Sequence, residues 1–228
     1  MKNCNVAVII PAFNEEMSIK LVVRDIPRYL VSEIVIVDNG STDNTGAEAR
    51  EAGTRVVFEP KHGYGSACKA GVKYLEKTPP PIVVFLDADY SDYPNDMTSL
   101  IQPILSERAD LVLGSRLMLN RKNAVSSHVI AANRFFSKLI NFLYGLNLTD
   151  LGPFRAIRWD SLKRLDMRSE SYGWSCEMIV KAAKQNLTIV EIPVRYRRRI
   201  GKSKISGSFW RSLQASISIL YNVVRHKL

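Results

Sequence analysis

The first 115 residues alternate between short apolar runs and stretches of helical pattern, and this alternation restricts the fold more than any other feature. The apolar runs lie at 6–10, 33–38, 55–58, 82–86 and 111–114. The helical stretches between them lie at 18–29, 43–52, 66–76 and 96–107. Continuous apolar runs of this length are typical of parallel strands that are covered on both faces. Repeated strand–helix units therefore predict an α/β protein with a mostly parallel central sheet flanked by helices.

The second half is less regular but contains two amphipathic patterns. Residues 132–146 place apolar side chains on one side of a helix and Asn133, Arg134, Ser137, Lys138 and Asn141 on the opposite side. Residues 208–224 show a similar pattern, and neither stretch contains the ~20 apolar residues needed to span a bilayer. Without a repeat or a low-complexity linker, we expect one domain over 1–207. Residues 208–228 would form a basic amphipathic helix that belongs to this domain or faces a membrane.

The positive charge is concentrated at the C-terminal end. The net charge is +10, and the chain from Arg195 onward has nine Lys and Arg residues and no Asp or Glu. Such a segment favours an anionic partner, which could be nucleic acid, substrate phosphates or an anionic membrane surface; a solvated basic face is the alternative. Nucleic acid is disfavoured because no recognised binding motif accompanies the charge. Three widely spaced cysteines (Cys4, Cys68 and Cys176) and a polar N-terminus without a signal-peptide pattern indicate reduced thiols in a cytosolic protein.

Acidic side chains follow several of the predicted strands. Asp87 and Asp89 leave the apolar run 82–86 two residues apart, so their carboxylates point to the same side and can share one divalent cation. Mg²⁺ and Mn²⁺ prefer such oxygen ligands and are often completed by substrate phosphates. Glu15 and Asp38 follow two other strands, and ligands of parallel sheets bind at these strand ends. Helix capping is the alternative role for such acids, and we expect it for Asp43.

A series of motifs then gives a more specific expectation. In order they are IPAFNEE at 10–16, VDNGSTD at 37–43, GYGSACKAG at 63–71, LDAD at 86–89, GSR at 114–116, GPFRA at 152–156, EIPV at 191–194 and GKSK at 201–204. In this combination the chain resembles the family 2 glycosyltransferases of the GT-A (Rossmann-like) fold. Within that family it is most similar to polyprenyl-phosphate glycosyltransferases of the dolichol-phosphate mannose synthase type.

The resemblance implies an activity and a set of site residues. The activity is inverting transfer of a hexose from a nucleotide sugar, of the GDP-mannose or UDP-glucose type, to a polyprenyl or dolichyl phosphate. The implied donor-binding residues are Pro11, Ala12, Glu15, Asp38, Lys69, Asp87 and Ala88, with Asp87 and Asp89 also holding the metal. Arg116 would face the acceptor phosphate, helped by Arg134 and Ser137. Arg155, Lys202 and Lys204 would add positive charge around the reacting phosphates.

Two positions depart from the family pattern. Ser91 stands where relatives carry a glutamine that reaches the metal, and the next residue is Asp92, which could be a third ligand or a surface cap. Asn133 stands where relatives carry an acceptor-binding arginine, with Arg134 beside it.

The type of acceptor determines whether the reaction needs a base. A phosphate monoester has a second pKa of about 6 and is largely ionised at neutral pH, so it needs positioning more than deprotonation. A sugar hydroxyl would need a general base, for which Asp150 and Glu177 are the candidates; both could instead orient loops through backbone hydrogen bonds. Transfer to a soluble or glycan hydroxyl is therefore the alternative function. A non-catalytic protein that binds nucleotide sugars or nucleic acid is the second alternative.

The amphipathic helices and the basic tail favour a cytoplasmic protein that associates peripherally with the inner face of the membrane. Burial of the apolar faces in the core or in a homodimer interface is the alternative.

Overall fold

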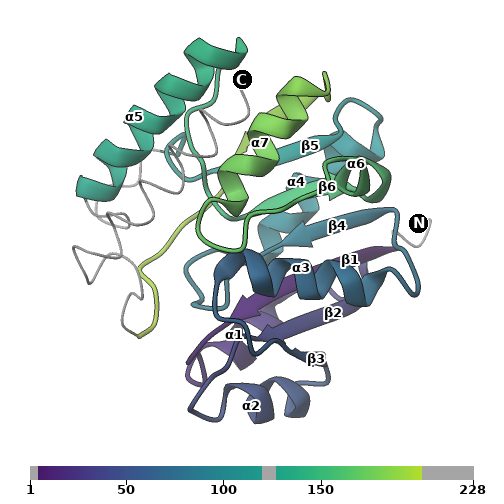
Figure 1. Cartoon of the computed structure of the whole chain (residues 1–228). Coiled ribbons are helices and arrows are strands. Elements are labelled where there is room, and N and C mark those ends of the chain that lie inside the picture. Colours follow the sequence, from purple (N-terminus) through teal and green to yellow (C-terminus); the bar gives the residue numbers. More distant parts are fainter. Residues whose placement is uncertain (1–4, 120–126, 202–228) are drawn as a thin grey trace.

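The computed structural model describes residues 5–119 and 127–201, which form a seven-stranded sheet between two layers of helices (Figure 1). The strands are β1 (Val6–Ala12), β2 (Val31–Asp38), β3 (Arg55–Phe58), β4 (Ile82–Phe85), β5 (Leu111–Ser115), β6 (Arg155–Arg158) and β7 (Ile189–Pro193). Their order across the sheet is β3-β2-β1-β4-β6-β5-β7. All neighbours pair in parallel except β6, which is antiparallel to both β4 and β5. The predicted α/β fold with a mostly parallel sheet is confirmed.

The helices cover both faces of the sheet. They are α1 (Ile19–Asp25), α2 (Thr45–Glu51), α3 (Tyr64–Leu75), a 3-10 turn η1 (Pro94–Asp96), α4 (Met97–Leu105), α5 (Ser127–Tyr144), α6 (Trp159–Arg164) and α7 (Trp174–Lys184). Alternate residues of β1 point to opposite faces, so Val8 packs with α1, α2 and α4 while Ile9 packs with α3, α6 and α7. This two-sided burial explains why the strands appear in the sequence as continuous apolar runs.

The five strands and four helices predicted in the first 115 residues are present, with shifted ends. Helix α1 ends at Asp25, before the predicted residue 29, because Ile26 precedes a proline and adopts an extended conformation. Helix α5 begins at Ser127, before the predicted residue 132. Strands β6 and β7 are short, and the sequence pattern did not predict them. No helix in the described ranges is long and apolar enough to cross a membrane.

Parallel pairing brings the acidic strand exits together. In the ladder Ala12 of β1 lies opposite Asp38 of β2, and Ile9 of β1 lies opposite Phe85 of β4. The segments that follow these three strands therefore emerge at the same edge of the sheet. Two residues there, Asn14 and Tyr90, have positive φ angles of 53° and 63°, which non-glycine residues seldom adopt. Such backbone conformations are common where side chains are aimed at a ligand.

Candidate active site

A cleft of about 400 Å³ opens at this edge of the sheet. Its lining residues are Pro11, Ala12, Phe13, Glu15, Asn39, His62, Gly63, Tyr64, Asp87, Ala88, Asp89, Tyr172 and Arg199. The structure thus places six of the predicted site residues around one space: Pro11, Ala12, Glu15, Asp87, Ala88 and Asp89. Asp38 and Lys69, also predicted to bind the donor, are not among them.

Arg199 lies between two acids of the cleft. Its Nη2 is 3.1 Å from Oε1 of Glu15 and 3.2 Å from Oδ2 of Asp89. Both acids are buried, with exposed fractions of 8% and 5%, so the guanidinium offsets charge that would otherwise be costly to bury. The backbone N–H of Ser91 donates to the other oxygen of Asp89, at 2.9 Å. These two contacts hold the side chain of Asp89 in place in the lining of the cleft.

The segment that carries Arg199 is fixed to the strand exit by backbone bonds. The N–H of Ile200 donates to the carbonyl oxygen of Asp89 (3.0 Å), and that of Arg197 donates to Ser91 (2.8 Å). The guanidinium of Arg197 also donates to the carbonyl oxygen of Tyr90, at 2.6 Å, and lies over the ring of that residue. The beginning of the acid-free basic segment is thus part of the cleft wall.

Asp87 and Asp92 have unusual environments. Burial, followed by the nearby Asp89 carboxylate, raises the pKa of Asp87 to about 7. Burial, followed by the charges of Asp87 and Asp89, raises the pKa of Asp92 well above its ordinary value. Within the described part of the chain, Oδ1 of Asp87 and both carboxylate oxygens of Asp92 have no hydrogen-bond partner. Buried polar atoms without partners are rare and often mark a place where an ion or ligand binds.

These residues fit a divalent cation held jointly by protein and substrate. Asp87 and Asp89 present carboxylate oxygens to the cleft, and one oxygen of Asp87 lacks a partner. Over residues 5–119 and 127–201, no three acidic, histidine or cysteine side chains come together as a metal site, and Asp92 as a third ligand stays a prediction. The remaining ligands would have to come from substrate oxygens, as is usual for Mg²⁺.

Asn39 holds another part of the cleft lining in place. Its side-chain amide donates to the carbonyl oxygens of Glu59 (3.0 Å) and Lys61 (2.8 Å), and its Oδ1 accepts from the N–H of Gly63 (2.7 Å). These bonds hold the loop that carries His62, whose ring lies edge-on to Phe13 at 5.5 Å. Asp38 lies beside this wall and instead accepts a hydrogen bond from the N–H of Ser41, at 2.9 Å.

Arg116 and Asp150 form a second polar centre. Nε and Nη2 of Arg116 contact the two carboxylate oxygens of Asp150 at 2.8 and 2.7 Å, and the backbone N–H of Arg116 adds a third bond at 2.8 Å. Asp150 is fully buried, which raises its pKa, but the charge and hydrogen bonds of Arg116 outweigh this effect and hold the pKa below its ordinary value. Burial raises the pKa of both Asp87 and Asp92, and the charge of Arg116 offsets part of this rise, which links this centre electrostatically to the cleft.

The loop around Asp150 is held by polar side chains from other elements. Glu191 of β7 accepts hydrogen bonds from the N–H groups of Thr149 (2.9 Å) and Asp150 (2.8 Å). Asn133 of α5 accepts from the N–H of Leu151 at 3.0 Å. Asn141 binds both the N–H and the carbonyl oxygen of Leu148, each at 2.9 Å. The EIPV motif and the polar side of α5 therefore position this loop.

On α5, exposure to solvent does not simply follow the polarity of the side chains. Ser137 lies between Asn133 and Asn141 on the side that faces the loop; it is only 3% exposed, and its hydroxyl has no partner among the described residues. Conversely, Phe135 and Phe142 are 62% and 85% exposed. The sequence pattern predicted polar residues opposite an apolar side. In the structure part of the polar side is buried because Asn133 and Asn141 bind backbone groups.

Several other predicted site residues do not line the cleft. Arg155 is buried and donates to the backbone carbonyl oxygens of Ser175 (2.8 Å) and of residues 151–153, so it supports loops and does not present its charge to a phosphate. Glu177 accepts hydrogen bonds from the N–H groups of Arg168 (2.9 Å) and Ser169 (2.7 Å). It therefore orients a loop, which was the predicted alternative to a role as general base. Lys69 lines a different cavity. Arg134 is exposed on α5, and Lys202 and Lys204 lie outside the described residues.

The structure also adds cleft residues that the sequence did not single out. Arg199, Tyr64 and Tyr172 all line the cleft. A signal for Arg199 was present, because it belongs to the acid-free basic segment. Tyr64 stands inside the glycine-containing motif 63–71, but nothing in the sequence indicated that Tyr172 lies nearby.

The sequence of the chain matches the family model described as "Glycosyl transferase family 2" over residues 7–166. The chain belongs to this glycosyltransferase family. It is 36% identical to an uncharacterised glycosyltransferase of Mycobacterium tuberculosis, over 92% of this chain and 94% of that protein. It is also 33% identical to an undecaprenyl-phosphate mannosyltransferase of Micrococcus luteus (89% and 88% covered). A dolichyl-phosphate hexose transferase of Haloferax volcanii is 32% identical (88% and 86% covered).

The structural comparison confirms the GT-A fold of this family 2 glycosyltransferase. Glucosyl-3-phosphoglycerate synthase of Mycobacterium tuberculosis, solved with Mn²⁺, uridine diphosphate and phosphoglyceric acid, superposes with a TM-score of 0.77. The alignment covers 98% of this chain and 78% of that one, at 23% sequence identity. In this glycosyltransferase the cleft lies at the exits of β1, β2 and β4, and Arg116 and Asp150 form a second polar centre.

Proposed function

We propose that the enzyme transfers a hexose from a nucleotide sugar to a polyprenyl phosphate. The nucleotide sugar would occupy the cleft, with its diphosphate near Asp87, Asp89 and Arg199. A Mg²⁺ or Mn²⁺ ion held by the two aspartates would offset the charge that develops on the leaving nucleoside diphosphate. The acceptor phosphate would approach from the side of Arg116 and attack the anomeric carbon with inversion.

The observation that supports a phosphate acceptor is that Asp150 is poorly suited to act as a general base. A general base must be able to take up a proton, but both oxygens of Asp150 are bound by Arg116, and its pKa is held below the ordinary value. Glu177, the other candidate base, binds the backbone of residues 168 and 169. An acceptor that arrives already ionised suits such a site. Relatives whose names specify undecaprenyl or dolichyl phosphate as the acceptor support the same choice.

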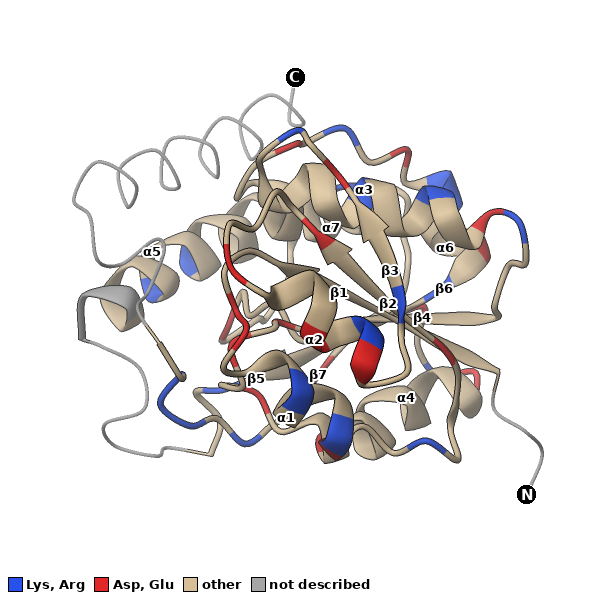
Figure 2. Ribbon diagram, turned by 90° about the horizontal axis from the view of Figure 1, so that it is seen from below, with Lys and Arg blue, Asp and Glu red and all other residues tan. Residues whose placement is uncertain are grey.

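The outer side of α5 supports access to a membrane-bound acceptor. Phe135 and Phe142 are seven residues apart, so they lie on one side of the helix, and both are exposed. Arg134 and Lys138 are exposed as well, and the helix has no Asp or Glu (Figure 2). Aromatic side chains flanked by cations favour contact with the surface of an anionic membrane. We therefore propose that the enzyme binds the cytoplasmic membrane surface peripherally, with α5 facing the lipid.

An acceptor assay tests the proposed reaction. The full chain is incubated with Mg²⁺ or Mn²⁺ and with labelled UDP-glucose, UDP-N-acetylglucosamine or GDP-mannose. Each donor is combined with a short-chain polyprenyl phosphate, with the matched polyprenol that lacks the phosphate, or with a soluble glycan. We expect a labelled lipid with at least one donor and only with the phosphorylated acceptor. Transfer to a soluble glycan, with none to the lipid phosphate, would support the hydroxyl-acceptor alternative.

A further inference from the structure

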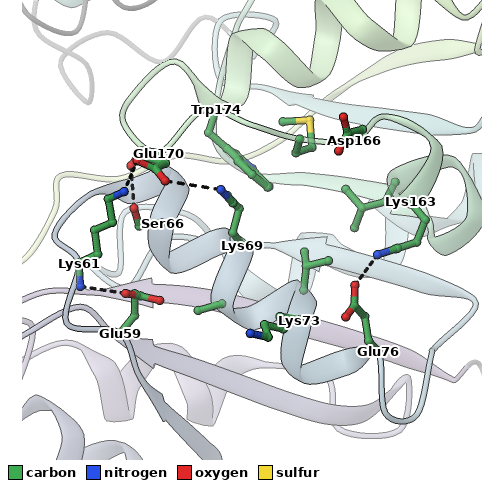
Figure 3. A pocket seen from close by; sticks show the side chains of 14 residues that line it. Glu59, Lys61, Ser66, Lys69, Lys73, Glu76, Lys163, Asp166, Glu170 and Trp174 are labelled. Carbon is green, nitrogen blue, oxygen red and sulfur yellow. Dashed lines mark hydrogen bonds and ion pairs between the residues drawn. The ribbon is translucent and has the colours of Figure 1, made fainter.

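A second cavity of about 390 Å³ lies between α3 and the segment that connects α6 to α7 (Figure 3). Among the described residues, none lines both this cavity and the donor cleft. Residues 168–172 run between them: Glu170 faces the second cavity and Tyr172 faces the cleft. This segment packs closely on the start of α3, because a Cβ at Gly65 would lie only 2.2 Å from the carbonyl oxygen of Ser169.

The cavity combines a cationic rim with an apolar wall. Lys61, Lys69, Lys73 and Lys163 contribute the cations. Met167 and Trp174 contribute apolar surface, and Trp174 is 1% exposed. The indole N–H of Trp174 is buried and has no hydrogen-bond partner in the described part of the chain. A buried donor without a partner is costly unless a ligand or water satisfies it.

The acids that line the cavity neutralise this rim only in part. Lys163 is paired with Glu76, Asp166 is paired with Arg168, and a carboxylate oxygen of Glu59 accepts from the backbone N–H of Lys61. Lys61 and Lys69 share one carboxylate, that of Glu170, at 2.5 and 3.6 Å. Lys73 lies one turn after Lys69 on α3 and has no ion pair among the described residues.

Glu170 has the features of a displaceable internal ligand. Its side chain is 45% exposed, and it reaches its two lysines from a loop. The loop itself is held by backbone bonds, because the carbonyl oxygen of Glu170 accepts from the N–H and the hydroxyl of Ser66, at 3.0 and 3.3 Å. An exposed ion pair contributes little, so a doubly charged anion can replace this carboxylate without unfolding the loop.

We propose that this cavity binds a small organic phosphate. The phosphate replaces the Glu170 carboxylate at Lys61 and Lys69 and gains Lys73 as a further partner. A phosphate suits the rim because it carries about two negative charges at neutral pH and three acceptor oxygens. The non-polar part of the molecule lies against Met167 and Trp174. This site is separate from the donor cleft and does not depend on the proposed reaction.

Titration calorimetry with phenyl phosphate as the probe tests the site in the full chain. Lys73→Ala is expected to weaken binding about five-fold, as for the loss of one ion pair. Lys77→Ala is the matched control, because Lys77 is an exposed cation four residues further on that does not line the cavity. Lys77→Ala should leave the affinity unchanged. Glu170→Gln should tighten binding several-fold, because the amide competes less well than a carboxylate for the two lysines.

Several outcomes would overturn the proposal. One is no measurable binding of the probe to the wild-type protein. Another is equal affinity in wild type, Lys73→Ala and Lys77→Ala. A third is binding that Glu170→Gln does not strengthen. Binding that is insensitive to Lys73→Ala but lost in Arg199→Ala would place the probe in the donor cleft and would also reject the second site.

Discussion

The proposed donor side, which is the cleft, and the proposed acceptor side, which is the centre around Arg116 and Asp150, are built in different ways. The donor cleft is formed by residues that directly follow parallel strands, so its acids are brought together by the sheet itself. The acceptor side around Arg116 and Asp150 is formed by a loop that side chains from α5 and β7 hold in place. The first arrangement depends on strand order and the second on individual polar contacts. Substitutions on the two sides should therefore have different effects on activity and stability.

The largest effect is expected on the donor side, for Asp89→Asn. The substitution keeps the size of the side chain but removes a charge that faces the proposed cation and contacts Arg199. Transfer should fall about 1,000-fold, as for the loss of a group that stabilises transition-state charge. Because backbone bonds from Ile200 and Arg197 also hold the strand exit, the circular dichroism spectrum should remain that of wild type. Full activity in Asp89→Asn would contradict the role proposed for Asp89 and for the cleft.

On the acceptor side, Asp150→Asn should reduce stability as well as activity. It leaves the buried guanidinium of Arg116 without its counter-charge, which should cost about 3 kcal/mol in urea denaturation. Asp166→Asn is the matched control, because its pair with Arg168 is largely exposed, and no measurable change is expected. An Asp150→Asn variant as stable as wild type would show that the pair of Arg116 and Asp150 does not stabilise the acceptor side.

The pair of Arg116 and Asp150 also makes the free energy of unfolding depend on pH in a defined direction. The pKa of Asp150 is lower in the folded protein than its ordinary value of 3.8. The stabilisation is therefore complete above 3.8 and is lost as the pH falls through the lower pKa of the folded state. The difference in unfolding free energy between wild type and Asp150→Asn should be constant near neutral pH and shrink in acid. A difference that grows in acid would contradict the direction of the shift.

A pair of asparagines allows the two sides to be compared directly. Asn39 binds backbone groups of residues 59, 61 and 63, in a loop beside the cleft that we call the donor loop. Asn141 binds the backbone of Leu148, in the loop at 145–151 that we call the acceptor loop. Each change to Ala should cost about 1–2 kcal/mol in unfolding free energy.

These two variants should raise the KM values of different substrates. Asn39→Ala should raise KM for the nucleotide sugar, and Asn141→Ala should raise KM for the acceptor. Asn147→Ala, at an exposed position of the acceptor loop, should change neither. If both variants raised the same KM, the two sides would not be separate binding regions.

The smallest effect is expected for membrane association. Replacing Phe135 and Phe142 by Ser should reduce recovery with anionic liposomes in flotation a few-fold, because the exposed apolar surface of α5 is lost. Phe58→Ser is the control, since Phe58 is similarly exposed (63%) but lies on β3, an edge strand at the end of the sheet opposite β7. Equal recovery of all three proteins would contradict the proposed orientation of α5.

The sequence by itself determined the α/β class, the strands of the first half and the acids at their exits. These features depend on local periodicity and on the rule that parallel strands end at one edge of a sheet. The family motifs added the GT-A fold, and six of the residues that they predicted to bind donor or metal line one cleft. Asp87 and Asp89 could therefore be assigned to a common site before any contact was known.

Only the tertiary structure determined the partners of the buried charges. No local pattern indicates that Arg199 contacts Glu15 and Asp89, or that Asp150 is bound by Arg116. Strand β6 lies between β4 and β5 although it follows both in the chain, and it carries Arg155 into the interior. The environment of a charged side chain depends on residues distant in sequence, and the pairing of Asp150 and the burial of Arg155 follow from that environment. Composition and spacing do not contain this information.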